Sequence, residues 1–526
     1  MRVFPPRLVS VPEMIAFERE ADSRGLSYEK MMENAGLGLA HVVDERYQFL
    51  KPGPVLGLVG SGNNGGDTLV ALEYLSDWGW QVEAYIARPR AVGDPLVQRV
   101  LQSGGVVLDG ESDAGFQQLA EMIGRSNILL DGVLGTGIRL PLRDRVSELL
   151  LWVGGFLEEM ELPPTVVAVD CPSGIDCDSG EAAPECFQAD LTVTMAAIKR
   201  GLLKFPAYNL VGDLELVSIG LTEEIHSWRS IPRFVADETY VMNQLPERRL
   251  DAHKGTFGTA LIIAGSTNYT GAVLLAGQAA YRAGAGLVTL GVPASLHPIL
   301  AGHFVEGIWL PLPEEEGAIA ASAAEVVWDN LERPTALLLG PGFGLAAGTE
   351  KFVGRMFLLE SMNRLPPTVV DADGLKLLSG LENWSRRLPP NSVLTPHPGE
   401  MSVLKGLPAA EIQSARLEIA ERYAREWGLV VLLKGAFTVI ASPSGKTAMI
   451  PVATPALARA GTGDVLAGLV VGLMAQKMEP FEAGVTAAWI HAQAGLRAAG
   501  VLGSSASVLA GDILQGVVDV MADISA

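Results

Sequence analysis

Short apolar runs, each followed by a glycine-rich turn or a helical pattern, constrain the fold of this chain more than any other feature. Strands that alternate with helices in this way form parallel sheets with helices on both faces. The order therefore predicts an α/β protein built from doubly wound sheets. The first series of expected strands comprises residues 55–59, 82–87, 128–130, 165–169, 191–195 and 214–219, after helices within residues 12–48.

A second series of the same kind starts at residue 260 and has helical patterns at residues 272–283 and 464–475. Between the two series, residues 221–249 are polar and contain Pro232 and Pro246, which is typical of a linker and a domain entry. A chain of 526 residues also exceeds one ordinary domain. We therefore expect domains at residues 10–222 and 232–526, with a linker at residues 223–231. The second series of strands is expected at residues 260–264, 287–290, 336–339, 368–370, 392–395, 430–433 and 438–440.

Charge and composition exclude several classes of partner. The net charge of −21 argues against nucleic acid and against an anionic membrane, because both require a basic surface. The longest apolar run, at residues 465–475, is too short to span a bilayer, and residues 1–20 lack the apolar core of a signal peptide. Cys171, Cys177 and Cys186 do not have the spacing of a zinc site and are interpreted as reduced thiols. We expect a cytoplasmic protein.

The sequence Gly-Ser-Gly-Asn-Asn-Gly-Gly-Asp at residues 60–67 follows an expected strand and precedes a helix. Small residues there let backbone N–H groups approach a phosphate. The glycines match the dinucleotide fingerprint, but a dehydrogenase also needs an acid at the end of the second strand, and Glu83 lies at its start. A dehydrogenase is therefore poorly supported. A tight turn without a ligand is the other interpretation.

Two further loops, at residues 131–137 and 170–176, also follow strands and also contain acids. Loops at the carboxyl ends of parallel strands converge on one crevice. Together the three loops predict a polar pocket with oxygen ligands and N–H donors, suited to a phosphorylated ligand and to a hard cation.

In this order, and with Met-Glu-Asn-Ala-Gly at residues 32–36, the three loops resemble the NAD(P)H-hydrate epimerase family over residues 10–222. The resemblance implies a Rossmann-like domain that binds hydrated NADH or NADPH, and potassium bound by Asn64, Asp131 and Ser173. Thr68 stands where the family often has glycine. Asp170 is our candidate for acid–base catalysis, although its carboxylate could instead bind ribose. The implied nucleotide-binding residues are Asn63, Asn64, Gly65, Gly66, Asp67, Gly135, Thr136, Gly137, Ile138, Arg139, Leu140, Pro141 and Asp170.

The second half contains a glycine-rich turn at residues 460–463 that leads into an apolar helix with Asp464 in its first turn. Backbone N–H groups at such a helix start stabilise a transferring phosphoryl group, and Asp464 is placed to accept a proton from an attacking hydroxyl. Asp464 as an ordinary helix cap is the alternative, but a cap does not explain the glycines.

This turn resembles the ribokinase-like superfamily, and the motifs before it narrow the resemblance to the ADP- or ATP-dependent NAD(P)H-hydrate dehydratase family over residues 232–526. Those motifs lie at residues 253–258, 264–266, 269–272, 282–288, 340–344, 371–373, 395–400 and 433–436. The resemblance implies that Gly344, His397 and Asp464 contact the hydrated nucleotide. It also implies that the ring hydroxyl is phosphorylated and that phosphate then leaves, with magnesium accompanying ADP or ATP.

Two stretches around this turn are the implied adenine-nucleotide site. The family often has Asn-Pro-Gly-Met where this chain has Thr-Pro-Ala-Leu at residues 454–457, which puts the contact at Thr454 in doubt. Glu400 is a second candidate for a water-mediated metal contact. The implied residues are Lys434, Gly435, Ala436, Phe437, Thr438, Thr454, Pro455, Ala456, Leu457, Ala458, Arg459, Ala460, Gly461, Thr462 and Gly463.

Both resemblances together predict a bifunctional repair enzyme. It would interconvert the epimers of NADHX and NADPHX and then dehydrate the S form, with ADP, as bacterial members use, or with ATP. The family also implies a homo-oligomer. One alternative is a sugar or hydroxymethylpyrimidine-type kinase with an accessory domain, which leaves residues 395–400 and the first half unexplained. Another is a sensor or scaffold with inactive sites, against which the intact Asp464 and residues 63–67 argue.

Overall fold

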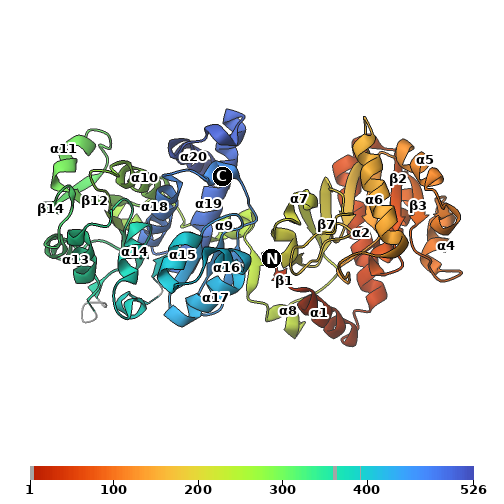
Figure 1. Cartoon of the computed structure of the whole chain (residues 1–526), viewed down its shortest axis with the longest axis horizontal. Coiled ribbons are helices and arrows are strands. Elements are labelled where there is room, and N and C mark those ends of the chain that lie inside the picture. Colours follow the sequence, from red (N-terminus) through yellow and green to blue (C-terminus); the bar gives the residue numbers. More distant parts are fainter. Residues whose placement is uncertain (1–4, 359–363, 391, 526) are drawn as a thin grey trace. The chain divides into compact units, whose positions relative to one another are not determined.

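The computed structural model describes residues 5–358, 364–390 and 392–525, and the chain forms two compact units, one of residues 6–231 and one that begins at Pro232. Each unit is built around a mainly parallel sheet with helices on both faces (Figure 1), so the predicted α/β class is confirmed. None of the described helices is both long enough and apolar enough to cross a membrane.

The sheet of the first unit is parallel throughout. Its central strands are buried along their length, which is why they are continuous apolar runs in the sequence. In spatial order the strands are β4 (Val106–Asp109), β3 (Gln81–Ile86), β2 (Pro54–Val59), β5 (Ile128–Gly132), β6 (Thr165–Val169), β7 (Leu191–Met195) and β9 (Asp213–Val217). A separate parallel pair joins β1 (Leu8–Val9) to β8 (Ile198–Lys199).

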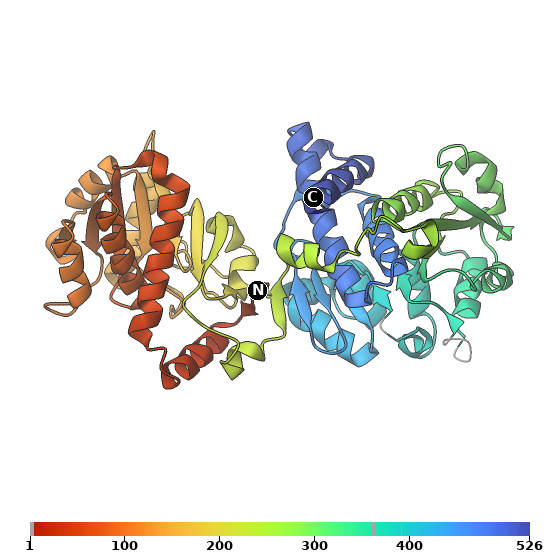
Figure 2. The same ribbon diagram turned by 180° about the vertical axis from the view of Figure 1, so that it is seen from behind.

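Helices cover both faces of this sheet, and each face has its own hydrophobic core. Leu39 and Leu69 belong to one core, and Leu119 and Leu149 belong to the other. Figure 2 shows the long helix α2 lying across its face of the sheet. The first face carries α1 (Val11–Ser23), α2 (Tyr28–Tyr47), α3 (Asn63–Asp77) and α4 (Pro95–Gln102), and the second carries α5 (Gln117–Arg125) and α6 (Asp144–Glu159).

The structure differs from the sequence-based expectations at several places in this unit. Strand β4 was not predicted, although Val106, Val107 and Leu108 form a short apolar run; it is an edge strand whose residues are all at least partly exposed. Helix α3 begins at Asn63, so residues 63–67, expected as part of a loop, belong to the start of a helix. Asn and Gly are weak helix formers, which hides this turn from a reading based on propensity.

Residues 223–231, expected as a linker, contain the short helix α8 (His226–Arg229). The ring of Trp228 packs edge-on against Phe17 of α1, with 5.3 Å between ring centroids. The Glu20 carboxylate accepts hydrogen bonds from the backbone N–H groups of His226 and Ser227. This segment is therefore held on the first unit.

The second unit has a ten-stranded sheet that is parallel except where β20 pairs antiparallel with both neighbours. Sequence analysis missed its edge strands β10 and β13 and also β21, because they are short or partly exposed. In spatial order the strands are β10 (Arg233–Val235), β21 (Thr447–Met449), β20 (Val439–Ala441), β19 (Val430–Leu433), β18 (Val393–Leu394), β17 (Thr368–Val370), β16 (Ala336–Leu339), β11 (Thr259–Ile263), β12 (Leu287–Pro293) and β13 (Ile308–Leu312).

One face of this sheet packs against a continuous core from four long helices, and Figure 1 shows a second group of helices on the opposite face. The first group is α10 (Gly271–Arg282), α18 (Thr462–Ala475), α19 (Pro480–Leu502) and α20 (Ala510–Ser525). The second is α13 (Ala347–Met356), α14 (Asp373–Ser379), α15 (Pro398–Lys405), α16 (Ala409–Ser414) and α17 (Arg416–Trp427). Shorter elements are α7 (Tyr208–Val211), α9 (Glu238–Gln244), α11 (His297–Leu300), α12 (Ala323–Asp329), β14 (Glu314–Glu315) and β15 (Ala318–Ile319).

Helix α18 lies against α10 at backbone contact distance. A Cβ added at Gly468 would lie 2.3 Å from the carbonyl oxygen of Ala276 and 2.7 Å from its Cα. No side chain fits there unless the two helices separate. Because α18 carries Asp464 in its first turn, this close packing also fixes the position of that carboxyl.

We expect Gly468→Val to lower the melting temperature of the full-length protein, because the overpacked helix pair loses about 2–3 kcal/mol or more. The matched control is Gly500→Ala in α19, where an added Cβ meets nothing within 4 Å. That substitution should stabilise the chain by about 0.5–1 kcal/mol. Thermal unfolding followed by circular dichroism measures both, and equal melting temperatures for the two variants would contradict the packing argument.

Candidate functional site

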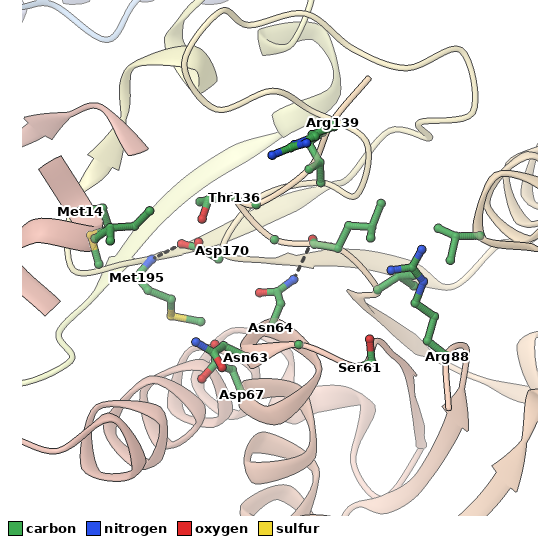
Figure 3. A pocket seen from close by; sticks show the side chains of 18 of the residues that line it. Met14, Ser61, Asn63, Asn64, Asp67, Arg88, Thr136, Arg139, Asp170 and Met195 are labelled. Carbon is green, nitrogen blue, oxygen red and sulfur yellow. Dashed lines mark hydrogen bonds between the residues drawn. The ribbon is translucent and has the colours of Figure 1, made fainter. Parts of the chain in front are cut away.

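The first unit contains a cavity of about 970 Å³ where the loops after β2, β5 and β6 meet. Figure 3 shows Asn63, Asn64 and Asp67 from the first turn of α3 on one side of it, and Thr136, Arg139 and Asp170 on the other. The structure thus brings together the three loops singled out in the sequence. Of the predicted residues, it places Asn63, Asn64, Asp67, Gly135, Thr136, Gly137, Ile138, Arg139, Leu140, Pro141 and Asp170 on the cavity wall.

Glycines in the first loop allow the backbone to turn tightly against the next strand. A Cβ on Gly60 would lie 2.0 Å from the Val133 carbonyl oxygen, and one on Gly65 would lie 2.1 Å from the Gly60 carbonyl oxygen. Gly65 and Gly66 are therefore packing positions behind the wall and do not line the cavity. Gly62 is the N-cap of α3 and provides no side-chain acceptor, so the first N–H groups of the helix are left for a ligand.

The three predicted cation ligands meet at the peptide of Leu134. The Asn64 amide donates to the Leu134 carbonyl oxygen at 2.9 Å, and the Leu134 N–H donates to Ser173 Oγ at 2.8 Å. Ser173 in turn donates from Oγ and from its backbone N–H to Asp131, at 2.6 and 2.7 Å. Burial raises the pKa of Asp131, which is 1% exposed, because no cation of the described residues pairs with it.

The donor atoms of this arrangement are of the kind that hard cations prefer. It offers a carboxylate, an amide oxygen, a hydroxyl and a carbonyl oxygen, all of them hard donors. Within the described ranges, no three His, Cys, Asp or Glu side chains are grouped to hold a metal ion. A cation bound here would therefore depend on neutral oxygens as much as on carboxylates.

Asp170 lies at the end of β6 with φ of 63°, a left-handed conformation that is uncommon for a residue other than glycine. Its Oδ1 accepts hydrogen bonds from the Met195 N–H at 2.9 Å and from Thr194 Oγ1 at 3.3 Å. It also forms an ion pair with Lys199, which is completely buried. The remaining Lys199 contacts are to Thr194 Oγ1 at 3.1 Å and the Met195 carbonyl oxygen at 2.9 Å.

Sequence analysis missed Lys199. A lysine inside the apolar stretch that follows the β7 strand was the available signal, because a buried lysine needs a partner. The part of the cavity wall that α1 and α2 form was also not predicted, because these segments have the apolar pattern of helices that pack against a hydrophobic core. The additional lining residues are Met14, Ile15, Glu18, Tyr28, Met31, Met32, Ala35, Arg88, Arg143 and Asp144.

Two further carboxyls of this cavity have perturbed acidities. Burial, followed by the negative charges of Asp170 and Glu18, raises the pKa of Asp67 well above its ordinary value. Burial is also the main cause of the raised pKa of Glu18, and Asp170 raises it further. In both cases Lys199 acts in the opposite direction but does not cancel the effect of burial. The cavity thus holds one aspartate paired with a lysine, Asp170, and two acids whose pKa is raised, Asp67 and Glu18.

The second unit gathers its candidate residues at the carboxyl ends of β16, β17, β18 and β19. Lys434, after β19, lies 2.7 Å from Asp371 Oδ1 and 3.6 Å from Glu400 Oε2. Thr395 Oγ1 also donates to Asp371 Oδ1, at 2.7 Å. Burial alone would lower the pKa of Lys434, but Asp371 and Glu400 outweigh burial and raise it. Lys434 therefore stays an ammonium group at this end of the sheet.

The loop after β17 places Asp371 and Asp373 in different directions, because Ala372 between them has a φ of 53°. Asp371 contacts Lys434, whereas Asp373 Oδ2 accepts a hydrogen bond from the Gly344 N–H at 3.0 Å. Predicted residue Gly344 is thereby tied to the same cluster.

His397 is the N-cap of α15. Its Nδ1 accepts hydrogen bonds from the N–H groups of Gly399, at 3.0 Å, and Glu400, at 3.3 Å, while Glu400 Oε2 accepts from the His397 N–H at 2.9 Å. The side chain is 53% exposed, so Nε2 faces solvent or Glu400 Oε1, which lies at 3.4 Å. This capping role coexists with the predicted ligand contact, since the ring keeps an exposed edge.

Helix α18 begins after Gly461, whose φ of 89° favours glycine and which provides no side-chain cap. The Thr462 N–H donates to the Arg459 carbonyl oxygen at 3.4 Å, and the next N–H groups, of Gly463 and Asp464, are left for an anion. Burial, followed by the charge of Asp371, raises the pKa of Asp464 to about 7, and Lys434 partly opposes the effect. The carboxyl of Asp464 is thus close to half-ionised at neutral pH.

The predicted adenine-nucleotide stretches lie next to this helix start. Lys434 and Thr438 bracket the turn after β19, where Thr438 Oγ1 donates to the Gly435 carbonyl oxygen at 2.9 Å. Thr454 accepts a hydrogen bond from the Ala456 N–H at 3.2 Å, so its hydroxyl serves a local turn. Thr462 Oγ1 donates to the Leu457 and Arg459 carbonyl oxygens, both at 2.9 Å, and holds the stretch against α18.

His491 of α19 was missed by sequence analysis, because a histidine inside an apolar helix has no distinguishing pattern. It is 7% exposed and forms a hydrogen bond with the Thr462 backbone, while its Nε2 has no partner among the described residues. Burial lowers the pKa of His491 to about 4, so the ring is neutral and supports the helix start without adding charge.

Comparison with known families divides the chain in the same way as the structure. Residues 28–201 match the family described as "YjeF-related protein N-terminus", and residues 260–516 match the family described as "NAD(P)H-hydrate dehydratase". The two matches lie in different compact units.

Full-length relatives have the same two parts. The chain is 36% identical to the bifunctional NAD(P)H-hydrate repair enzyme of Moorella thermoacetica, over 97% of this chain and 95% of that protein. The enzyme of the same description from Escherichia coli is 32% identical, over 92% and 90%. Among solved structures, the ADP/ATP-dependent NAD(P)H-hydrate dehydratase of Bacillus subtilis, co-crystallised with ATP and Mg²⁺, is 29% identical with a TM-score of 0.46, covering 55% of this chain and 98% of that one.

Asp464→Asn should stabilise the second unit at neutral and alkaline pH. The penalty for ionising Asp464 in the folded chain is absent below its ordinary pKa of 3.8 and complete above about pH 7. This shift in the pKa of Asp464 corresponds to about 4 kcal/mol. Because the carboxyl is partly solvated, we expect Asp464→Asn to raise the free energy of unfolding by about 2–3 kcal/mol. Urea unfolding at pH 4 and pH 8 measures it, with the exposed Glu332→Gln as control. An equal effect of Asp464→Asn at both pH values would show that ionisation is not the cause.

Proposed function

The chain belongs to the family of bifunctional NAD(P)H-hydrate repair enzymes, and we propose that its two units perform the two steps of that repair. Residues 10–222 would interconvert the R and S epimers of NADHX and NADPHX in the cavity of the first unit. Residues 232–526 would dehydrate the S epimer at the start of α18, using ADP or ATP. When ADP is used, the products are NAD(P)H, AMP and phosphate.

One observation carries the proposal: both units gather charged and polar side chains at the carboxyl end of their sheets. Each site combines a glycine-capped helix start with a lysine–aspartate pair and a second acid whose pKa is raised. A scaffold with inactive sites would have no need for such perturbed acids, because they cost stability. A kinase with an accessory domain would not need the first cavity.

In the dehydratase site, Asp464 would accept the proton of the ring hydroxyl as that oxygen attacks the terminal phosphorus of the nucleotide. The N–H groups at the start of α18 would face the transferring phosphoryl group. Lys434, which lies in the loop after β19, would offset the negative charge of the phosphate. Loss of phosphate from the ring carbon then restores the dihydronicotinamide. Magnesium bound with the nucleotide would neutralise further phosphate charge, and Glu400, whose Oε2 lies 3.6 Å from Lys434, would orient its water ligands.

In the epimerase site, the uncapped N–H groups of α3 would face a phosphate of the hydrated nucleotide. Asn64, Asp131 and Ser173, grouped around Leu134, would bind potassium. A bound cation would offset the buried charge of Asp131. Homo-oligomer formation and a cytoplasmic location stay predictions from the sequence and the family.

The function is tested by the recovery of absorbance at the NADH band. We expect the full-length protein to convert a mixture of both NADHX epimers completely when Mg²⁺ and ADP, or Mg²⁺ and ATP, are supplied. Recovery that stops when one epimer is consumed would mean that the first unit is no epimerase. If neither donor supports recovery, the kinase alternative takes precedence, and release of a stable phosphorylated product would support it.

Asp464→Asn should lower the rate of dehydration by a factor of about 10²–10⁴, because the base is lost, while epimerisation continues. In the unsubstituted protein the rate of dehydration should rise with pH through about 7, since only the ionised carboxylate accepts the proton. Initial rates between pH 5.5 and 9 measure both effects. A dehydration rate that falls over this range, or an Asp464→Asn variant with ordinary activity, would assign the base elsewhere.

A further inference from the structure

We propose that Asp67 is the proton donor of the epimerisation and that Asp170 is a fixed negative charge beside it. The inference rests on the proposed epimerase function of the first unit. The hydrogen-bond partners of the acids in the cavity indicate which of them carries a transferable proton.

The environments of the two aspartates differ in the donors that they contain. Asp170 is satisfied by the Lys199 ammonium, the Met195 N–H and the Thr194 hydroxyl. Asp67 is 9% exposed and lines the same cavity, yet its carboxyl has no hydrogen bond or ion pair with any of the described residues. A buried carboxyl without donors is stable only as the neutral acid, which is the form that can give a proton.

The second acid of the wall, Glu18 on α1, is less suitable. Burial raises the pKa of Glu18 as well, but its side chain is only partly buried, so water can exchange its proton and solvate its charge. Asp67 lies on the first turn of α3 next to Asn63, beside the predicted nucleotide-binding residues (Figure 3). Asp67 is therefore better placed than Glu18 to give a proton to a bound nucleotide.

Other charged and titratable groups face this cavity. Those that act on the acidity of Asp67 are Asp170 and Glu18, which hold the proton on it, and Lys199, which opposes them. With burial as the largest effect, the balance raises the pKa of Asp67. The remaining titratable or charged groups of the wall are Tyr28, Arg88, Arg139, Arg143 and Asp144.

The proposed step balances with water as the co-reactant. Asp67 gives its proton to the hydroxyl oxygen of the hydrated ring carbon, the C–O bond breaks, and water leaves with the bonding pair. The lone pair of the ring nitrogen forms a C=N bond, which leaves a cationic ring that the charge of Asp170 stabilises. Water then adds to the opposite face of that carbon, the π pair returns to nitrogen, and the surplus proton returns to Asp67 through the water in the cavity.

The test uses the full-length protein without ADP or ATP, so that dehydration cannot proceed. A single purified NADHX epimer is supplied, and its conversion to the other is followed by chromatography. Asp67→Asn should lower kcat by about 10²–10⁴-fold and change KM by less than threefold. Asp67→Glu should recover at least tenfold over Asp67→Asn, because it restores an acid. Glu83→Gln is the matched control, since Glu83 is also 9% exposed but lies outside the cavity, and it should stay within twofold of the unsubstituted protein.

The pH profile separates a proton donor from a structural residue. In the unsubstituted protein kcat should fall as the pH rises through the pKa of Asp67, and this limb should be lost in Asp67→Asn. If that variant does not fold, a displaced limb in Asp67→Glu gives the same information. The inference is wrong if Asp67→Asn keeps a third or more of kcat, if the alkaline limb is unchanged, or if Glu18→Gln causes the large loss instead. If the unsubstituted protein does not exceed the spontaneous rate, the proposed epimerase function itself fails.

Discussion

A lysine–aspartate pair at the carboxyl end of a parallel sheet sets the electrostatics of each unit. Lys199 pairs with Asp170 in the first unit, and Lys434 pairs with Asp371 in the second. Each pair joins one aspartate to a lysine, and burial raises the pKa of a second aspartate nearby, Asp67 or Asp464. Neighbouring acids whose environments separate their protonation states can divide the roles of fixed charge and proton carrier.

Both sites contain features that lower the stability of the folded chain, and the rest of the fold compensates for them. Removing one partner of a buried pair leaves an uncompensated charge, which typically costs about 3–5 kcal/mol. The helices α3 and α18 begin at Gly62 and Gly461, which provide no side-chain cap, although a serine or aspartate there would stabilise the helix. Non-glycine residues with positive φ, Asp170 and Ala372, stand at the ends of β6 and β17. Uncapped helix starts and unfavourable backbone angles are thus found where ligands are expected to bind.

Both units place their candidate residues at the carboxyl ends of mainly parallel strands, but they enclose them differently. In the first, α1 and α2 close over the loops and form a deep cavity, so that water is partly excluded from Asp67 and Asp170. In the second, the cluster lies at the start of α18, a helix packed so closely on α10 that Gly468 accepts no side chain. The first arrangement suits a reaction within one bound molecule, and the second suits the meeting of two substrates at a helix start.

The sequence by itself determined the α/β class, most strands and the loops of both sites. The buried strands β2, β5 and β16 are continuous apolar runs. Residues 60–67 and 131–137 follow neighbouring parallel strands of the first unit, so topology alone brings them to one edge of that sheet, and residues 460–464 precede helix α18 of the second unit. The edge strands β4 and β13 were missed although they contain apolar residues, since both are short and partly exposed, and the helical start at residues 63–67 has no helix-forming pattern.

Only the tertiary structure decided which acids are paired and which are isolated. Lys199 is 29 residues from Asp170 in the sequence, and Lys434 is 63 residues from Asp371, so no local motif links them. Asp67 and Asp170 both follow strands within glycine-containing motifs, and nothing in the sequence distinguishes a carboxyl with three donors from one with none. The pKa of a carboxyl depends on solvent exposure and on charges a few ångströms away, and both are fixed only when distant segments pack together.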